Sequence, residues 1–180
     1  DLRLAEIFSH HPQYFPAFFS CNVAMGTDKW CNRCHKCAFT YLALYPFMQL
    51  TDLDAIFGER LFEVTDIRRQ VIELATAKIK PWECVGTVEE SQLALAITLR
   101  KSPQMNFAEA PRRADLERAC AGLDIDAACS NTLGTFLGPH NLPDFLEGKV
   151  QNYSEQLLTT TLQRDPELWP ASLRQRALAA

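Results

Sequence analysis

The sequence has no excess of positive charge and no long hydrophobic run. It contains 18 Lys and Arg residues against 22 Asp and Glu residues, a net charge of −4. A nucleic-acid-binding domain normally carries a basic face, so we expect no nucleic-acid partner. The longest apolar run, residues 38–50, is interrupted by Thr40, Pro46 and Gln49 and is shorter than the roughly 20 residues that span a bilayer. With no secretory signal visible either, we expect a cytoplasmic protein with reduced cysteines and no membrane contact.

Alternating strand patterns and glycine-rich loops are also scarce. No apolar/polar alternation of useful length occurs, and the chain has only seven glycines, none of them in a phosphate-binding loop. The fold class that we predict is therefore mainly α, with any nucleotide site lying mostly elsewhere. At 180 residues with 47% hydrophobic content, residues 1–180 suffice for a single module. Because the chain opens at Asp1 in what reads as the middle of a protein, we expect this module to be part of a longer chain.

Apolar spacing and capping signals predict the order of the helices. We expect helices over residues 2–10, 38–45, 52–58, 65–77, 87–101, 112–121, 124–133 and 144–162, with an extended segment at 78–85 and a turn-rich linker at 134–143. His140 in that linker is not expected to be catalytic. The last helix should be amphipathic, with Leu146, Val150, Tyr153, Leu157 and Thr160/Thr161 along its buried face, and the tail after Asp165 should be weakly held.

Four of the seven cysteines fall within seventeen residues, in the pattern C-x9-C-x2-C-x2-C. They are Cys21, Cys31, Cys34 and Cys37. Four thiolates satisfy the tetrahedral preference of zinc and leave no open position. The sequence thus predicts a structural zinc-binding loop over residues 20–38, with the last two ligands in the first turn of an almost wholly apolar, buried helix. The zinc would clamp the start of that helix.

Other uses of these cysteines remain open. Disulfides are disfavoured by the close spacing and the reducing compartment, but an iron–sulfur cluster or redox thiols remain alternatives. His35 is a rival ligand, although residues inside a C-x2-C turn normally point away from the metal. Lys29, Arg33 and Lys36 would offset the charge of the thiolates, or else contact a phosphate or carboxylate.

A second motif lies just before the helix expected at 87–101. Thr87 and Glu90 fit a capping box, and Glu89 and Glu90 lie where the helix dipole favours anions. Neither effect explains Cys84, which lies beside Gly86 and close to a helix N-terminus. Cys84 is either a reactive thiol or a small buried hydrophobic residue.

Taken together, the two motifs carry a family resemblance. Residues 20–39 contain SCN followed by WCNRCHKCAF, and residues 80–91 read KPWECVGTVEES. This combination resembles the C-terminal half of the bacterial UDP-N-acetylmuramoyl-L-alanyl-L-glutamate epimerases. The cysteine motif alone is also similar to that of the 7-cyano-7-deazaguanine synthases and related pyrophosphate-loop enzymes, which adenylate a carboxylate. The resemblance covers about residues 20–91.

The resemblance implies a function in cell-wall synthesis. The chain would form the C-terminal part of a larger α/β enzyme that inverts the terminal L-glutamate of a nucleotide-linked muropeptide precursor, using ATP and Mg²⁺. Adenylating the glutamate carboxylate acidifies the neighbouring α-proton, which a base can then exchange. The candidate acid/base residues are Cys84, Glu83, Glu89 and Glu90. The precursor and the N-terminal domain of the same protein would be its partners, and the module alone should be inactive. The alternatives are another carboxylate-adenylating enzyme of the pyrophosphate-loop type, or a zinc-stabilised helical binding module.

Overall fold

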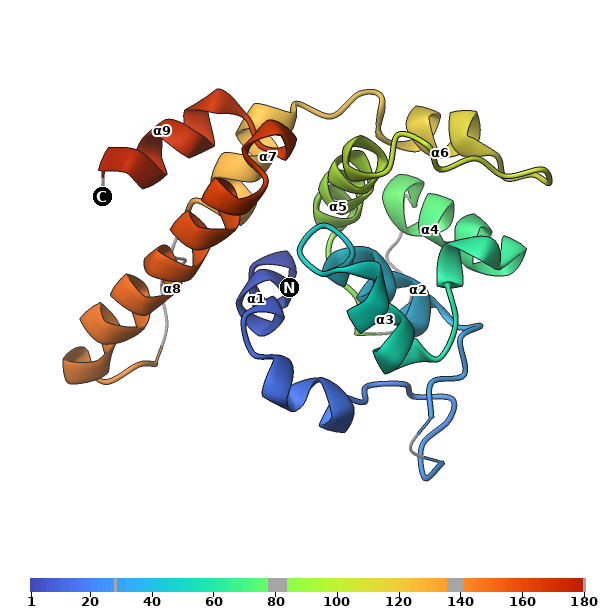
Figure 1. Cartoon of the computed structure of the whole chain (residues 1–180), viewed down its shortest axis with the longest axis horizontal. Helices are drawn as coiled ribbons and strands as arrows, with labels where there is room; N and C mark the ends of the chain where they lie inside the picture. Colours follow the sequence, from blue (N-terminus) through green and yellow to red (C-terminus); the bar gives the residue numbers. More distant parts are fainter. Residues whose placement is uncertain (28, 78–83, 136–140, 180) are drawn as a thin grey trace.

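The computed structural model describes residues 1–27, 29–77, 84–135 and 141–179, and every regular element within these ranges is helical (Figure 1). The α-helices are α1 (Leu2–Ser9), α2 (His35–Leu44), α3 (Leu50–Phe57), α4 (Thr65–Thr76), α5 (Val88–Lys101), α6 (Arg113–Cys120), α7 (Ile125–Thr132), α8 (Asp144–Arg164) and α9 (Ala171–Ala179). Short 3₁₀ turns occupy Pro12–Ala17, Leu61–Glu63 and Pro166–Leu168. The mainly α prediction is confirmed for these ranges. Residues 78–83 of the extended segment predicted at 78–85 lie outside the described residues, as does His140.

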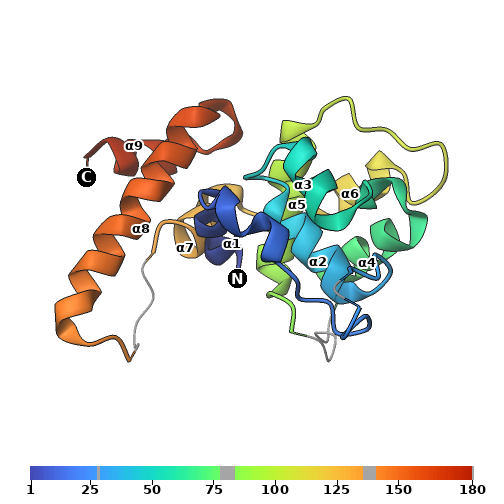
Figure 2. The same cartoon turned by 60° about the horizontal axis from the view of Figure 1, so that its bottom comes forward.

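Helix α2 is the centre of the larger part of the molecule. Every residue from Cys37 to Leu44 is buried, as a helix that is apolar all round requires. It packs against α1, α4 and α5, and Figure 2 shows α2–α6 gathered on one side of the molecule. The helix ends at Leu44, just before Pro46, which cannot continue a helical hydrogen-bond ladder.

A buried arginine fastens the loop between α5 and α6. Arg68 on α4 is only 2% exposed. Its guanidinium donates to the carbonyl oxygens of Pro111, Phe62 and Glu109 and lies over the ring of Phe107 at 4.3 Å. The planar fork of donors suits this task, because one side chain satisfies several carbonyls at once.

Helices α1 and α8 are joined by a buried polar network. The Glu6 side chain is fully buried, and its carboxylate accepts hydrogen bonds from Thr161 Oγ1 at 2.6 Å and from Arg3 at 2.9 Å. Arg3 also donates to the backbone oxygen and hydroxyl of Ser154. His10 Nε2 lies 2.8 Å from the Thr161 hydroxyl. This network ties α8 to α1, whereas α9 packs against α8 and α7.

Two predictions for the C-terminal region were wrong. Helix α8 buries Ser154, Leu158, Thr161 and Leu162, whereas Val150 and Tyr153 of the expected buried face are exposed. The tail after Asp165 is not weakly held, because Trp169 is buried and its ring stacks on Phe47 at 5.7 Å. Polar side chains of α1 determine which face of α8 is buried, and the stacking of Trp169 on Phe47 holds the tail.

None of the helices in the described ranges is long and apolar enough to cross a membrane.

Candidate metal centre and adjacent cavity

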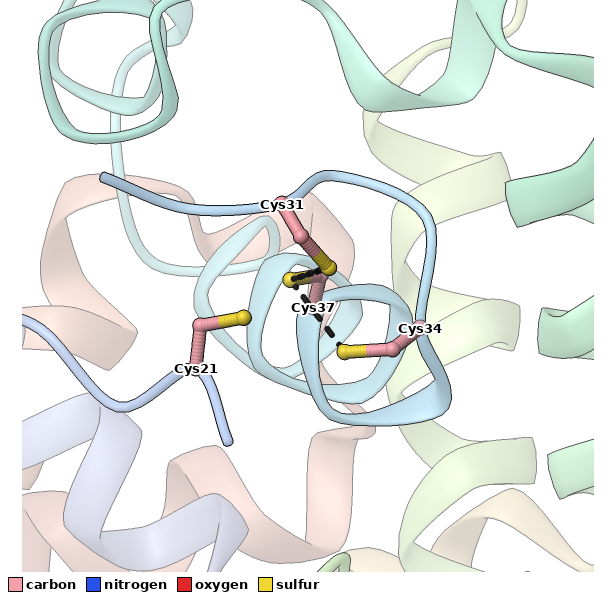
Figure 3. Close-up of side chains that lie close together, drawn as sticks. All are labelled: Cys21, Cys31, Cys34 and Cys37. Atoms are coloured by element: carbon pink, nitrogen blue, oxygen red, sulfur yellow. Dashed lines mark hydrogen bonds between the residues drawn. The ribbon is translucent and has the colours of Figure 1, made fainter. Parts of the chain in front are cut away.

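The four predicted ligands converge on one point. The sulfur atoms of Cys21, Cys31, Cys34 and Cys37 all lie within 4.8 Å of one another (Figure 3). Cys37 Sγ is 3.6 Å from Cys31 Sγ and 3.5 Å from Cys34 Sγ. Sulfurs bound tetrahedrally at about 2.3 Å from one zinc ion are separated by about 3.8 Å. The arrangement is therefore suited to hold one metal ion, as the spacing predicted.

Backbone N–H groups point at these sulfurs. The N–H of Asn32 donates to Cys37, that of Cys37 donates to Cys34, and those of Cys31 and Ala24 donate to Cys21. Asn32 adopts a positive φ of 54°, which turns the chain between two ligands, and its amide donates to the carbonyl of Phe57. Such donors stabilise negative charge on sulfur, which a metal ligand carries.

The pKa values of the cysteine thiols are shifted in opposite directions. Burial raises the pKa of Cys21, but the hydrogen bonds from Cys31 and Ala24 outweigh it and lower that pKa to about 7. Burial raises the pKa of Cys34 to about 11 and raises that of Cys37 as well. Four adjacent thiolates repel one another, so a cation at the centre takes the place of the protons that these thiols otherwise keep.

The surroundings of the centre fix its shape. His35 Nε2 lies 2.8 Å from the Glu73 carboxylate, and His35 is not part of the cluster that the four cysteines form, so the expectation that it is not a ligand is consistent with this geometry. Trp30, directly before Cys31, packs on Phe18, Phe19 and Phe57 at centroid distances of 4.5–5.6 Å. These aromatic rings shield the ligand loop from water.

A cavity of about 540 Å³ adjoins the metal centre between α1, α2 and residues 84–85; we call it the α1–α2 cavity. This volume is within the range of about 300–1,000 Å³ typical of small-molecule sites. Its walls are mostly apolar, with polar groups from a few side chains. The lining residues are Asp1, Leu4, Ala5, Phe8, Phe18, Ser20, Lys36, Phe39, Thr40, Ala43, Leu44, Cys84 and Val85.

Cys84 lies at this cavity and is exposed, so it is not the buried hydrophobic residue of the second interpretation. Lys36, between two of the metal ligands, donates to the carbonyl oxygen of Cys84 at 2.5 Å. Gly86 contacts the ring of Phe39 so closely that a Cβ atom there would lie 2.3 Å from Phe39 Cζ. The segment that carries Cys84 is thus fastened to α2 at two places.

The candidate glutamates are placed differently. Glu90 completes the predicted capping box with Thr87 and also accepts from the backbone N–H of Leu2 at 2.8 Å. Burial disfavours its charge, but hydrogen bonds from the Asp1 amino group, Leu2 and Thr87 lower its pKa. A carboxylate so engaged is a weak base. Glu89 lines a second cavity, near α7 and α8, and Glu83 lies outside the described residues.

Sequence reasoning did not find the cavity or the contact between Lys36 and Cys84. These two residues are 48 positions apart, and no local pattern links them. One signal was available: Lys36, Thr40 and Ala43 recur at helical spacing, which places a lysine and a hydroxyl on one face of an otherwise apolar helix.

The fold and the site together define a helical domain whose central helix begins at a cluster of four cysteines suited to bind a metal ion. A comparison with known protein families then identifies the family: the family model described as "MurL C-terminal domain" matches residues 17–120 of this chain. The match contains the cysteine loop, α2–α6 and Cys84. The chain therefore belongs to the MurL C-terminal domain family.

Three relatives with similar sequences have the same name. A UDP-N-acetyl-alpha-D-muramoyl-L-alanyl-L-glutamate epimerase of Micromonospora sp. is 34% identical over 148 residues, which cover 79% of this chain and 32% of that protein. The protein of the same name from Salinispora tropica is 32% identical with the same coverage. That from Xanthomonas oryzae pv. oryzae is 38% identical over 104 residues, 54% of this chain and 23% of that protein.

The chain thus spans about a third of the length of the curated relatives it matches most broadly. No solved structure matches it.

Proposed function

We propose that this chain is the C-terminal part of an epimerase that converts the terminal L-glutamate of UDP-N-acetylmuramoyl-L-alanyl-L-glutamate to D-glutamate. The observation that carries the proposal is the α1–α2 cavity: it adjoins the four-cysteine centre, and Cys84 of the second family motif lies exposed at it. The names of three relatives supply the substrate. The epimerase would contribute to peptidoglycan synthesis.

The chemistry that we propose begins outside the described residues. ATP and Mg²⁺, bound mostly on the remaining two thirds of the protein, would activate the glutamate α-carboxylate as an adenylate with release of pyrophosphate, and hydrolysis of the adenylate after inversion would release AMP and restore the carboxylate. Activation lowers the pKa of the α-proton, because the developing negative charge can spread onto a carbonyl that is no longer an anion. A base in the cavity then removes the proton, and its return to the opposite face inverts the centre. Cys84, which lines this cavity, is the first candidate for the exchange; Glu83 remains a candidate, and Glu89, which lines the second cavity, is a weaker one.

For the metal we propose zinc, held by Cys21, Cys31, Cys34 and Cys37. Sulfur separations of 3.5 and 3.6 Å support a single ion, because a cluster distributes its cysteine ligands over two or more irons. With four protein ligands zinc has no open position, so it supplies rigidity to the start of α2 and no Lewis-acid chemistry. Elemental analysis should find about one zinc per chain, and a brown, iron-containing protein would contradict the assignment.

The test uses the full-length protein. It is incubated in D₂O with UDP-N-acetylmuramoyl-L-alanyl-L-glutamate, ATP and Mg²⁺, and AMP, D-glutamate and deuterium at the α-carbon are measured. The proposal expects all three to appear together. AMP without D-glutamate would instead indicate a carboxylate-adenylating enzyme with another substrate.

The role of Cys84 is tested in the same assay with Cys84→Ala. We expect AMP formation to persist while deuterium incorporation falls by at least 100-fold, since general acid–base groups contribute about 10²–10⁴-fold. Cys120→Ala is the matched control, because Cys120 is a half-buried thiol on α6 that does not line the α1–α2 cavity. Full activity in Cys84→Ala would remove Cys84 from the mechanism.

A further inference from the structure

The α1–α2 cavity is lined by both apolar and polar side chains. Leu4, Phe8, Phe39 and Leu44 are among the apolar residues that form most of its wall. The polar groups come from the metal loop, from α2 and from the segment containing Cys84: the hydroxyls of Ser20 and Thr40, the ammonium of Lys36 and the thiol of Cys84. A ligand that fits must therefore combine small apolar groups with a polar, charged end.

Two charged side chains of the described residues line the cavity, the carboxylate of Asp1 and the ammonium of Lys36, so Lys36 is the side chain there that can hold an anion. Lys36 is half-buried on the first turn of α2, with metal ligands Cys34 and Cys37 on either side of it in the chain. The Lys36 ammonium donates to Cys84 O, so this cationic group lies beside the thiol-bearing residue at the cavity.

We propose that the α1–α2 cavity seats the L-alanyl-glutamate end of the substrate, with Lys36 holding the side-chain carboxylate of the glutamate. This inference rests on the proposed function. The α-carboxylate loses its charge during activation, whereas the side-chain carboxylate keeps its charge throughout and can be held by a permanent cation. The alanyl methyl and the glutamyl methylenes lie against the apolar wall. Because Lys36 contacts Cys84 O, this placement brings the α-carbon close to Cys84.

The experiment compares two substrates in the full-length enzyme. One is UDP-N-acetylmuramoyl-L-alanyl-L-glutamate, and the other carries L-glutamine in place of glutamate, which removes only the side-chain charge. Wild type should lose about 10- to 100-fold in kcat/KM on the glutamine substrate, the effect of one charge-assisted hydrogen bond. Lys36→Met should show a similar loss on the glutamate substrate and little further loss on the glutamine substrate.

Two variants control for damage to the fold. Lys36→Arg keeps the charge and should keep the preference for glutamate. Lys29→Met removes an exposed lysine of the same metal loop that does not line the cavity, and it should behave as wild type. Equal losses on both substrates in Lys36→Met, or an unchanged preference for glutamate, would overturn the assignment of Lys36.

A binding readout separates this inference from the proposed function. Alkylation of Cys84 by iodoacetamide is followed by peptide mass spectrometry, with and without UDP-N-acetylmuramoyl-L-alanyl-L-glutamate and without ATP. The substrate should slow alkylation in wild type and in Lys29→Met, but not in Lys36→Met. An enzyme that shows this protection yet forms no D-glutamate would refute the epimerase and retain the site. Absence of protection in wild type would refute the site, whatever the activity.

Discussion

Gly86 offers a direct test of how the segment carrying Cys84 is held against α2. A Cβ atom at this position would lie 2.3 and 2.7 Å from two atoms of the Phe39 ring and 2.8 Å from a Glu90 carboxylate oxygen. No positive φ is involved at Gly86, so alanine is tolerated by the backbone and any cost arises from these contacts. The Phe39 ring is 5% exposed and packed within the core, so it cannot move aside freely.

The magnitude follows from overpacking. Extra methyl groups in a packed interior cost about 1–3 kcal/mol. For a chain of this size that corresponds to a fall of roughly 2–12 °C in melting temperature. Gly86→Ala should therefore lower the urea midpoint of the metal-loaded protein, whereas Gly122→Ala, with no atom within 4 Å of the new Cβ, should leave it unchanged or slightly raised.

The decisive measurement is a double-mutant cycle with Phe39→Leu. The smaller side chain removes the obstructing ring atoms, so Gly86→Ala should cost at least about 0.5 kcal/mol less in the Phe39→Leu background. If the two changes were additive, the Phe39 ring would not be what excludes a side chain at position 86, and the packing described here would be wrong. In the full-length enzyme Gly86→Ala should also reduce epimerase activity, because it displaces the wall that carries Cys84.

Three further outcomes are expected. With zinc at the four-cysteine centre as proposed, Cys37→Ser should reduce the zinc content below one per chain and destabilise the domain by several kcal/mol, measured by elemental analysis and thermal unfolding, because structural zinc contributes folding energy directly. Arg68→Met should cost about 3 kcal/mol or more in urea unfolding, since it leaves buried carbonyl oxygens without donors, and Arg68→Lys should not restore the loss. The pKa of Glu90 is lowered in the folded state, so its charge stabilises the fold above the ordinary carboxyl pKa of 4.5, and this contribution is lost as the pH falls through the lowered value. The urea midpoint of wild type should thus exceed that of Glu90→Gln at pH 7 and approach it at pH 3.

Local signals predicted much of the fold and the clustering of four cysteines. The Thr87–Glu90 capping box and the apolar run after Cys37 depend on neighbours within four residues, and both appear as predicted. The cysteine cluster could be predicted because the close spacing of the four residues brings their sulfurs together.

What the sequence did not predict depends on distant partners. Thr161 and Ser154 are buried on α8 because Glu6 and Arg3 of α1, about 150 residues earlier, satisfy their hydrogen bonds. Thr161 lies on the predicted face, but hydrophobic periodicity counts Ser154 as polar and places Val150 and Tyr153, which are exposed, on that face instead. Trp169 is likewise held by Phe47, a partner that a local pattern cannot identify. The same limit hid the contact between Lys36 and Cys84.

The metal centre and the cavity are connected through α2. An ion with four thiolate ligands has no position left for substrate, so it can influence chemistry only by fixing the positions of other groups. Two contacts lead from the start of α2 to the same wall of the cavity: Lys36 to Cys84 O, and the Phe39 ring to Gly86. Removing the metal should therefore have its first functional effect at Cys84. In the full-length enzyme, we expect a chelator to abolish the protection of Cys84 by substrate at metal levels where the helix content is still retained. If the protection of Cys84 and the helix content were lost together, the metal would maintain the whole domain rather than this wall.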